Sequence, residues 1–276
     1  MDGKRILITG GNSGIGIVTA RELAKLGAEV VLACRESNKT NEALKMINAD
    51  AKIPAINLEV ELDSLQSVRD LSANFLNRYD RLDVLINNAG VFPPKQKMTV
   101  DGLEMQMGVN HLSHFLLTNL LLECLKVSSP SRVVTVSSKL HSGGKIDFDV
   151  FKGYQKYNSQ AAYNGSKLAN VLFSVELAKR LEGTGVTSNV LHPGAVSTDI
   201  TRDLPWVLRK IIGMIFISPE KGALTNIMLS SDPMLEDVTG KYFDQCELTE
   251  CSSQADDETL RQKLWEISAE MTGLIQ

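Results

Sequence analysis

A short β-rich run, Arg5–Thr9, leads into the glycine-rich stretch Gly10–Gly16 and then into an amphipathic segment that ends near Gly27. Glycines at such a junction let the backbone turn tightly and come close to a pyrophosphate, whose charge is met by free N–H groups and the positive end of the helix dipole. A second β-rich run follows at Val30–Ala33. This order predicts a nucleotide-binding unit, and the alternative is an ordinary glycine-rich turn. The residues expected to contact the nucleotide here are Gly10, Asn12, Ser13, Gly14, Ile15 and Gly16.

The alternation of strand and helix continues along the chain. After the first two strands, we expect strands at Ile53–Val60, Val84–Ile86, Arg132–Val136, Thr187–Leu191 and Gly240–Asp244. After the first helix, we expect helices at Asn38–Asn48, Ser64–Tyr79, Gly102–Leu125, Tyr163–Arg180 and Glu258–Met271, and one that starts at Ser218. This order predicts a doubly wound α/β fold, in which a seven-stranded, mostly parallel sheet carries helices on both faces. We expect residues 1–276 to form a single domain, because no shift in composition marks an internal boundary.

The composition excludes several classes of protein. Of 276 residues, 43% are apolar and 22% are charged, which suits one large α/β domain. The net charge of -4 gives no electrostatic basis for binding nucleic acid. The four cysteines lack metal-ligand spacing and are expected to be reduced thiols, and no apolar run is long enough to span a bilayer. Because Met1 leads almost directly into the first strand, we expect a cytoplasmic protein without a targeting segment.

The end of the second strand indicates which dinucleotide is preferred. A carboxylate at this position accepts a hydrogen bond from the ribose 2′-hydroxyl of NAD, whereas a cation binds the 2′-phosphate of NADP. Here the strand ends in Ala33-Cys34-Arg35, and no carboxylate precedes the arginine. Arg35 therefore predicts NADP(H) as the cofactor, and the alternative is a solvated surface arginine.

Two further turns follow strands and are candidates for the same crevice. The strand Val84–Ile86 runs into Asn87-Asn88-Ala89-Gly90, whose small and amide residues suit the close approach of a nucleotide. The strand Thr187–Leu191 runs into a Pro-Gly turn and small residues that could face a nicotinamide carboxamide. A plain loop is the alternative in both cases. The residues expected to contact the cofactor are Asn88, Ala89, Gly90, Pro193, Gly194, Val196 and Thr198.

Tyr163 and Lys167 form a candidate proton-transfer pair. If the chain is helical from about Tyr163, the four-residue spacing places the phenol and the ammonium on the same face of the helix. A phenol is a poor acid or base at neutral pH, but a cation within a few ångströms favours the phenolate and lowers its pKa. Such a pair also arises by chance, so its significance depends on the residues upstream.

Ser137 and Ser138 follow the strand Arg132–Val136, at the end where an open α/β sheet places reacting groups. Because no GxSxG turn surrounds them, we expect a hydrogen-bond partner for a substrate oxygen rather than a nucleophile. Asn110 lies inside the expected helix Gly102–Leu125 and predicts a local kink or a specific polar contact. Three histidines, His111, His114 and His141, are interpreted as structural, surface or supporting residues, because the first two lack a third metal ligand.

Taken in order, these motifs resemble the short-chain dehydrogenase/reductase family over nearly the full chain. The segments Ala33–Arg35, Val109–Leu112 and Ser166–Asn170 further resemble its NADP(H)-dependent, retinol dehydrogenase-like branch. In that branch the serine and the tyrosine are far apart in sequence, which favours Ser138 over Ser137. The residues that carry the family resemblance are Gly10, Gly14, Gly16, Asn87, Asn88, Ala89, Gly90, Asn110, Ser138, Tyr163, Lys167, Pro193 and Gly194.

The resemblance implies a Rossmann fold and a role for each catalytic residue. Tyr163 would exchange a proton with the carbonyl or alcohol oxygen, and Lys167 would lower the pKa of Tyr163 and hold the nicotinamide ribose. Ser138 would hydrogen-bond the reacting oxygen, and Asn110 would anchor a water on the proton path. Relatives in this branch often begin with a membrane-anchoring helix; because Met1 leads almost directly into the first strand, we do not expect one here.

The resemblance also implies that the segment around 199–218 lies over the substrate as a lid. Its runs Leu204–Leu208 and Ile211–Ile217 are strongly apolar, which suggests a lipophilic carbonyl or alcohol substrate, such as a retinal-like, steroid-like or lipid aldehyde compound. A buried helix, an oligomer contact or a peripheral membrane contact are the alternatives for this segment. The apolar runs Phe115–Leu125 and Val171–Leu177 could likewise build a homodimer interface or belong to the internal core.

Two other functions share parts of this pattern. A catalytically silent NADP(H)-sensing protein would use the same scaffold, but it would be expected to lack the tyrosine, the lysine or the serine, and this chain has all three. A sugar-nucleotide epimerase or dehydratase would share tyrosine and lysine, but those relatives usually have a different glycine spacing and a larger C-terminal substrate domain. The sequence therefore favours an NADP(H)-dependent oxidoreductase.

Overall fold

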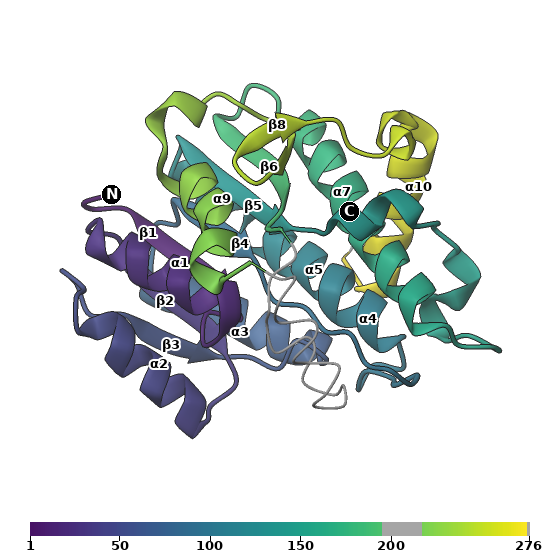
Figure 1. The fold of residues 1–276 in the computed structure, drawn as a ribbon, viewed down its shortest axis with the longest axis horizontal. Coiled ribbons are helices and arrows are strands. Elements are labelled where there is room, and N and C mark those ends of the chain that lie inside the picture. The colour runs from purple at the N-terminus through teal and green to yellow at the C-terminus, as the bar shows by residue number, and fades with distance from the viewer. Residues whose placement is uncertain (195–216, 275–276) are drawn as a thin grey trace.

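The strand β1 (Arg5–Thr9) shows how the sheet separates two layers of side chains. Leu7 belongs to one buried cluster, whereas its neighbours Ile6 and Ile8 belong to another. Successive residues of a strand point to opposite faces, so a run that is apolar at every position must be covered on both sides. The computed structural model, which describes residues 1–194 and 217–274, has helices on both faces of this sheet (Figure 1).

The described strands form one eight-stranded sheet in the order β3-β2-β1-β4-β5-β6-β7-β8. Strands β1 to β7 are parallel, and β8 pairs antiparallel with β7. The chain order reverses between β1 and β4, and such a switch point opens a crevice at the carboxyl ends of the strands. The other strands are β2 (Glu29–Cys34), β3 (Ile56–Glu59), β4 (Val84–Asn87), β5 (Ser131–Val136), β6 (Val186–His192), β7 (Tyr242–Asp244) and β8 (Glu247–Thr249).

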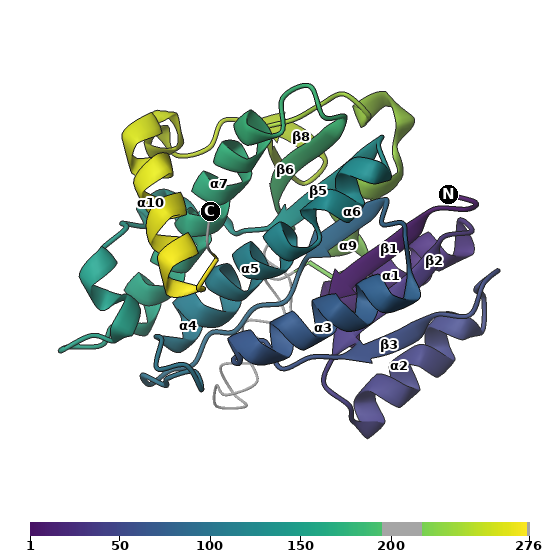
Figure 2. The same ribbon diagram turned by 180° about the vertical axis from the view of Figure 1, so that it is seen from behind.

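The helices divide into two layers. Helices α1 (Gly14–Lys25), α2 (Asn38–Asn48) and α9 (Pro219–Ser231) cover the face seen in Figure 1. Figure 2 shows the opposite face, where α3, α5, α7 and α10 lie side by side. The helices on this second side are α3 (Leu65–Arg78), α4 (Met105–Met107), α5 (Ser113–Leu120), α6 (Leu122–Val127), α7 (Ser159–Arg180) and α10 (Glu258–Met271). None of the described helices combines the length and apolarity needed to cross a membrane.

Several predicted boundaries were wrong. The third strand begins at Ile56 rather than Ile53, and the Tyr163 helix begins at Ser159. The outermost strand beyond β6 is β8, so the sheet has eight strands rather than seven. β8 escaped prediction because it is three residues long and fully exposed, which leaves no apolar alternation to detect.

The predicted helix Gly102–Leu125 is divided into shorter segments. Met105–Met107 is followed by a π-helical turn, η1 (Gly108–Leu112), and then by α5 and α6. Two 3-10 turns, η2 (Lys139–Gly143) and η3 (Phe148–Lys152), lie between β5 and α7. A π turn inserts one residue into a helix and is common at functional sites, and η1 contains Asn110.

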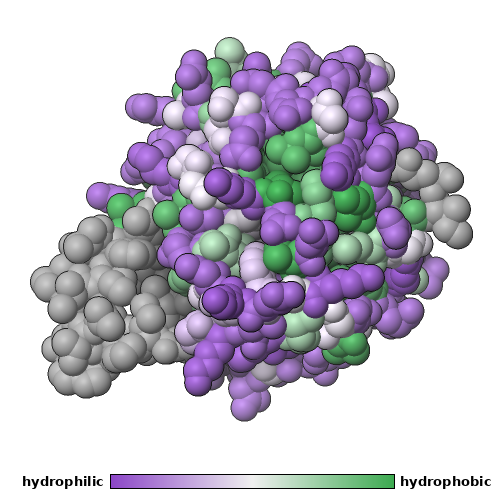
Figure 3. Space-filling view, turned by 90° about the vertical axis from the view of Figure 1, so that its right-hand side faces the viewer, coloured by the Kyte–Doolittle hydropathy of each residue, from purple (hydrophilic) through white to green (hydrophobic). Residues whose placement is uncertain are grey.

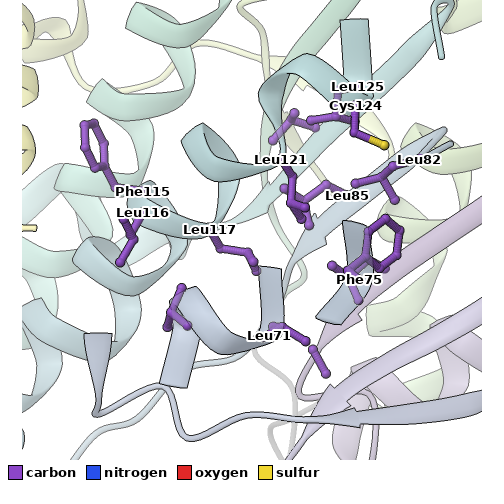
Figure 4. Packing of buried hydrophobic residues seen from close by; sticks show 14 of the residues in the cluster. Leu71, Phe75, Leu82, Leu85, Phe115, Leu116, Leu117, Leu121, Cys124 and Leu125 are labelled. Carbon is purple, nitrogen blue, oxygen red and sulfur yellow. The ribbon is translucent and has the colours of Figure 1, made fainter. Parts of the chain in front are cut away.

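The core on the α3 and α5 side is rich in leucine and phenylalanine (Figure 4). Phe75 of α3 and Leu121 lie near Leu85 of β4, and all three are fully buried. Burying such a side chain contributes about 1.5–3 kcal/mol, so this layer is a major source of stability. These contacts hold β4, and with it the turn at Asn88, in a fixed position at the crevice.

The aromatic surface of α5 and α7 is covered by α10. The Trp265 ring lies 4.9 Å from the ring of Phe115 and is stacked 5.9 Å from the ring of Phe173, and all three are buried. Phe115 and Phe173, one from each apolar run, therefore belong to the internal core. The homodimer interface considered for these runs stays a prediction. Figure 3 shows the molecule from the right-hand side of Figure 1. Hydrophilic residues dominate this face, and hydrophobic side chains gather near its centre.

Candidate active site

The glycine turn after β1 has room for backbone contacts that side chains would block. Gly10 adopts a φ of +65°, and a Cβ there would lie 3.1 Å from Cα of Ala89. A Cβ on Gly16 would overlap the carbonyl oxygen of Gly10 and lie 2.7 Å from Nδ2 of Asn88. Glycine at these positions therefore brings the start of α1 against the ends of β1 and β4, as a dinucleotide fold requires.

The first turn of α1 keeps its N–H groups available. Ser13 is the N-cap residue, but its side chain accepts no capping hydrogen bond. In contrast, α2, α3, α7, α9 and α10 each receive a side-chain cap. The N-terminus of α1 thus presents unpaired donors and the positive end of its dipole, which suits a pyrophosphate. Gly14, which begins α1, has a φ of +54°.

Thr9 ties the ends of β1 and β4 together and was not predicted as a site residue. Its Oγ1 accepts hydrogen bonds from the backbone N–H groups of Asn88 and Ala89, both at 3.0 Å. The Asn88 side chain returns a bond of 2.8 Å from Nδ2 to the carbonyl oxygen of Thr9. The predicted cofactor residues Asn88 and Ala89 are therefore held beside the glycine turn. The position of Thr9, directly before the first glycine of the turn, is a signal in the sequence that could have identified it as a site residue.

Asn12 links the glycine turn to the turn that carries Arg35. Nδ2 of Asn12 donates to Oγ1 of Thr40 at 2.9 Å, and that hydroxyl donates to the carbonyl oxygen of Arg35 at 2.7 Å. The side chain of Arg35 is exposed. The structure thus brings Arg35 to the same edge as the glycine turn, and its guanidinium is free to approach an anion at this edge. Thr40 was not identified in the sequence.

Tyr163 and Lys167 lie on one face of α7, as their spacing predicted. Both are buried, and Nζ of Lys167 lies 5.7 Å from the centre of the Tyr163 ring. Nζ also donates to the carbonyl oxygen of Val136 at 3.0 Å, which anchors the lysine to the end of β5. A Cβ on Gly90 would lie 3.4 Å from Nζ and 3.5 Å from Oδ1 of Asn110, so the β4 turn borders the same pair.

The acid–base properties of the pair differ from those expected from the lysine alone. Burial raises the pKa of Tyr163 to about 12, and a hydrogen bond with Ser138 opposes this rise. Burial lowers the pKa of Lys167 to about 8. Burial is the larger of these two influences on Tyr163, so the phenol is protonated at neutral pH. The role implied for Lys167, to lower the pKa of Tyr163, stays a prediction.

The structure distinguishes the two serines after β5. The Ser137 hydroxyl donates to the carbonyl oxygen of Lys167 at 2.7 Å, so it is committed to the backbone of α7. The Ser138 side chain instead hydrogen-bonds Tyr163 and caps η2 by accepting from the N–H of Leu140 at 3.3 Å. Ser138 is thus the serine that faces the phenol.

Asn110 makes the specific polar contact considered for it and lies in the π turn η1. Its Oδ1 accepts from the N–H of Val91 at 2.7 Å, and its Nδ2 donates to the carbonyl oxygen of Val91 at 3.1 Å and to Oγ of Ser166 at 3.0 Å. In η1, the N–H of Ser113 donates to the carbonyl oxygen of Gly108, five residues earlier. Asn110 thereby joins the π turn to the loop after β4 and to α7.

His114 supports this arrangement from beneath and is fully buried. Its Nδ1 lies 3.1 Å from the carbonyl oxygen of Asn110, and its Nε2 lies 2.9 Å from Oγ1 of Thr9. A carbonyl only accepts, so Nδ1 carries the proton and Nε2 accepts from the threonine hydroxyl. Burial lowers the pKa of His114 to about 4, which keeps this neutral tautomer. The interpretation of His114 as a structural residue is correct. Nothing in the sequence indicated that His114 connects Thr9, at the cofactor turn, with Asn110.

Phe92 forms a wall of the site that was also missed. Its ring centre lies 4.7 Å from that of Tyr163. The next residue, Pro93, is held by Ser159 and Tyr157, whose hydroxyls donate to its carbonyl oxygen at 2.6 and 3.3 Å.

Beyond β6, Gly194 has a φ of +88° at the same edge. The remaining predicted cofactor residues, Val196 and Thr198, and most of the predicted lid lie outside the described residues.

Comparison with known proteins decides the family. The profile described as short chain dehydrogenase matches residues 4–206. The chain belongs to the short-chain dehydrogenase/reductase family. Retinol dehydrogenase 14 of Homo sapiens is 47% identical to it, covering 100% of this chain and 88% of the relative. Retinol dehydrogenase 12 of Mus musculus is 45% identical, covering 99% and 87%. These similarities place the chain in the retinol dehydrogenase-like branch.

Solved structures agree with this assignment. An uncharacterised protein from Mycobacterium paratuberculosis aligns with a TM-score of 0.79 and 34% identity, covering 99% of this chain and 94% of that one. The Pseudomonas aeruginosa RhlG/NADP active-site complex aligns with a TM-score of 0.72 and 26% identity, covering 88% and 95%. The protein is therefore a hydride-transfer oxidoreductase of this family, with a Rossmann-like α/β fold.

Proposed function

We propose that this protein is an NADP(H)-dependent oxidoreductase that interconverts a lipophilic carbonyl compound and its alcohol, with Tyr163 as the acid and base. The observation that carries the proposal is the meeting of Tyr163, Ser138 and Lys167 at the carboxyl edge of the sheet. Those residues arrive from two elements, β5 and α7, that the fold holds side by side. A hydroxyl, a phenol and an amine in one buried place suit proton exchange with a carbonyl oxygen.

The cofactor site fits a phosphorylated dinucleotide. Gly10 and Gly16 leave the space that a Cβ would fill, and the start of α1 offers unpaired N–H groups. Arg35 would hold the 2′-phosphate, because its side chain is exposed at the edge linked to the glycine turn through Asn12. The nicotinamide, when bound, supplies or accepts the hydride. The relative named as an NADP complex supports the choice of NADP over NAD.

The protonation state of Tyr163 favours carbonyl reduction. A phenol with a pKa of about 12 holds its proton at neutral pH and can donate it to an oxygen that becomes an alkoxide. Ser138 would donate a second hydrogen bond to the same oxygen and align it. Lys167, with a pKa of about 8, would supply positive charge near the phenol and steady the resulting phenolate. Asn110 would hold the turn after β4 against α7. We also propose that Asn110 anchors a water on the proton path.

The described walls of the site suit an apolar substrate. The Phe92 ring lies against Tyr163. An aromatic ring beside a reacting phenol favours a hydrocarbon skeleton over a charged one. The names of the retinol dehydrogenase relatives point in the same direction. We therefore propose retinal-like, steroid-like or lipid aldehyde substrates.

Replacing Tyr163 tests this proposal directly. The substitution Tyr163→Phe keeps the ring that packs on Phe92 but removes the proton, so reduction should fall by at least about 10²-fold. NADPH affinity, measured by fluorescence titration, should stay within about threefold because the phosphate contacts are elsewhere. The assay follows NADPH oxidation with retinal, steroid ketones, lipid aldehydes and aromatic carbonyls, and repeats each with NADH. A fully active mutant would overturn the acid role. A wild-type protein that binds NADPH tightly but reduces none of these compounds would indicate a sensor instead.

A further inference from the structure

His141 lies behind Ser138 and joins it to a distant part of the chain. The imidazole is buried, and its Nδ1 lies 2.7 Å from the carbonyl oxygen of Ser138. On the other side of the ring, Nε2 lies 3.1 Å from the backbone nitrogen of Ser252, which is 111 residues away in sequence. The ring also packs on Tyr242 of β7, with ring centres 4.8 Å apart. His141 thus contacts the catalytic turn, the sheet and the segment after β8.

The two hydrogen bonds require one tautomer of a neutral ring. The Ser138 carbonyl only accepts, so Nδ1 donates to it; the Ser252 N–H only donates, so Nε2 accepts from it. A protonated imidazole would lose the bond from Ser252, and the reversed neutral tautomer would lose both bonds. Both ring nitrogens are therefore committed to backbone groups, and neither serves as a proton donor to substrate.

A second contact fastens the same two segments together. Nε2 of Gln254 donates to the carbonyl oxygen of Gly144, at the end of η2, at 3.0 Å. The η2 turn is capped by Ser138, and the segment Ser252–Gln254 contacts it at His141 and at its C-cap residue Gly144. Within the turn, the backbone N–H of His141 also donates to the carbonyl oxygen of Ser138 at 3.0 Å, and the imidazole adds a second bond to the same oxygen.

We infer that His141 is a positioning residue for Ser138, which it holds at the angle needed to meet Tyr163 while anchoring the segment Ser252–Gln254 to the catalytic turn. The inference rests on the proposed role of Ser138 toward a substrate oxygen. The rotation of the Ser138 hydroxyl depends on where its own carbonyl is held, because both belong to the residue that caps η2. A displacement of about 1 Å at such a group can cost about 10²-fold in rate.

Two amide substitutions separate the two bonds. The side-chain nitrogen of asparagine can take the place of Nδ1, so His141→Asn should keep the bond to Ser138 and lose the one to Ser252. Glutamine is longer and can reach the Ser252 N–H, so His141→Gln should keep the second bond and lose the first. Ser142→Ala is the matched control, since Ser142 lies in the same turn and donates only to the carbonyl oxygen of Lys139. Turnover, NADPH affinity, melting temperature and amide exchange are measured for each.

The expected pattern is an asymmetric one. His141→Gln should lower kcat at least about tenfold with an unchanged KM for NADPH, whereas His141→Asn should stay within about threefold of the wild type. Amide exchange should be faster across residues 137–144 in the glutamine variant, and faster across residues 250–256 in the asparagine variant. Equal losses in both variants that follow their melting temperatures, or no loss in either, would overturn the inference.

Failure of the proposed function gives a different result. If the wild-type protein reduces no carbonyl compound, the catalytic role of Ser138 falls, but the exchange pattern still shows whether His141 couples the two segments. If the wild type is active and exchange in residues 137–144 is unaffected by either substitution, the proposed function stands and the positioning role is refuted.

Discussion

Acid should destabilise this fold through two buried histidines, His111 and His114. His111 is fully buried, with Nε2 2.8 Å from Oγ of Ser268 and its ring beside Phe115 and Phe173. Burial is the main cause that lowers the pKa of His111 to about 3 and that of His114 to about 4. Both rings are therefore neutral in the folded protein at pH values where a free imidazole is largely charged.

The sign and size follow from proton linkage. The folded pKa values lie below the unfolded value of about 6.5, so the unfolded chain binds more protons between these values, and stability falls as the pH falls below about 6.5. Each histidine then costs about 1.4 kcal/mol per pH unit, which amounts to about 2 kcal/mol at pH of about 5. Both together remove about 4 kcal/mol, a large part of the stability of an ordinary domain.

Urea unfolding at pH of about 7.5 and about 5 measures this loss. The double variant His111→Gln, His114→Gln should be less stable at the higher pH, but it should lose about 4 kcal/mol less than the wild type between the two pH values. His141 and His192 also have lowered pKa values, and burial raises the pKa of Glu104. Because these groups are common to both proteins, the difference between the two losses of unfolding stability reports on His111 and His114 alone. An identical acid-induced loss in both proteins would refute the reasoning.

Three further substitutions test the cofactor site and the framework. Gly16→Ala places a methyl group against the carbonyl of Gly10 and should weaken NADPH binding more than about tenfold in fluorescence titrations; an unchanged Kd would contradict the tight approach of α1. Arg35→Ala should cost about 1.5–3 kcal/mol of NADPH affinity and leave NADH affinity unchanged, whereas equal losses would remove the 2′-phosphate role. Asp83→Asn should lower unfolding stability by about 2–3 kcal/mol, because the buried carboxylate of Asp83 accepts from Lys4 and Arg81; a loss below about 0.5 kcal/mol would count against it.

The sequence was most informative where a few neighbouring residues determine the geometry. The glycine turn after β1 could be predicted because a side chain at Gly10 or Gly16 would crowd the turn itself and the residues that follow β4. The positions of Tyr163 and Lys167 on one face of α7 followed from helical spacing. Ser138 was chosen from the family resemblance, and the structure supplies the physical reason, since Ser137 donates to the backbone of α7.

Contacts between distant segments could not be predicted in this way. The bond from Thr9 to His114 spans 105 residues, and the one from His141 to Ser252 spans 111. Single residues such as these carry no periodic pattern, so a sequence read alone interprets them as ordinary polar positions. The π turn at Gly108–Leu112 was hidden for a related reason, because one inserted residue hardly alters the apolar periodicity of a helix. The effect of burial on the pKa of Tyr163 could not be predicted either, because desolvation depends on the whole surroundings of the ring.

The placement of α10 has a practical consequence for engineering this protein. Trp265 packs against both Phe115 and Phe173, so α10 behaves as an internal layer although it is the most C-terminal of the described helices. A chain shortened before Glu258 would present a broad aromatic surface to water, and self-association would be one way to hide it. Fusion partners or labels are therefore better attached where they leave the packing of Trp265 untouched.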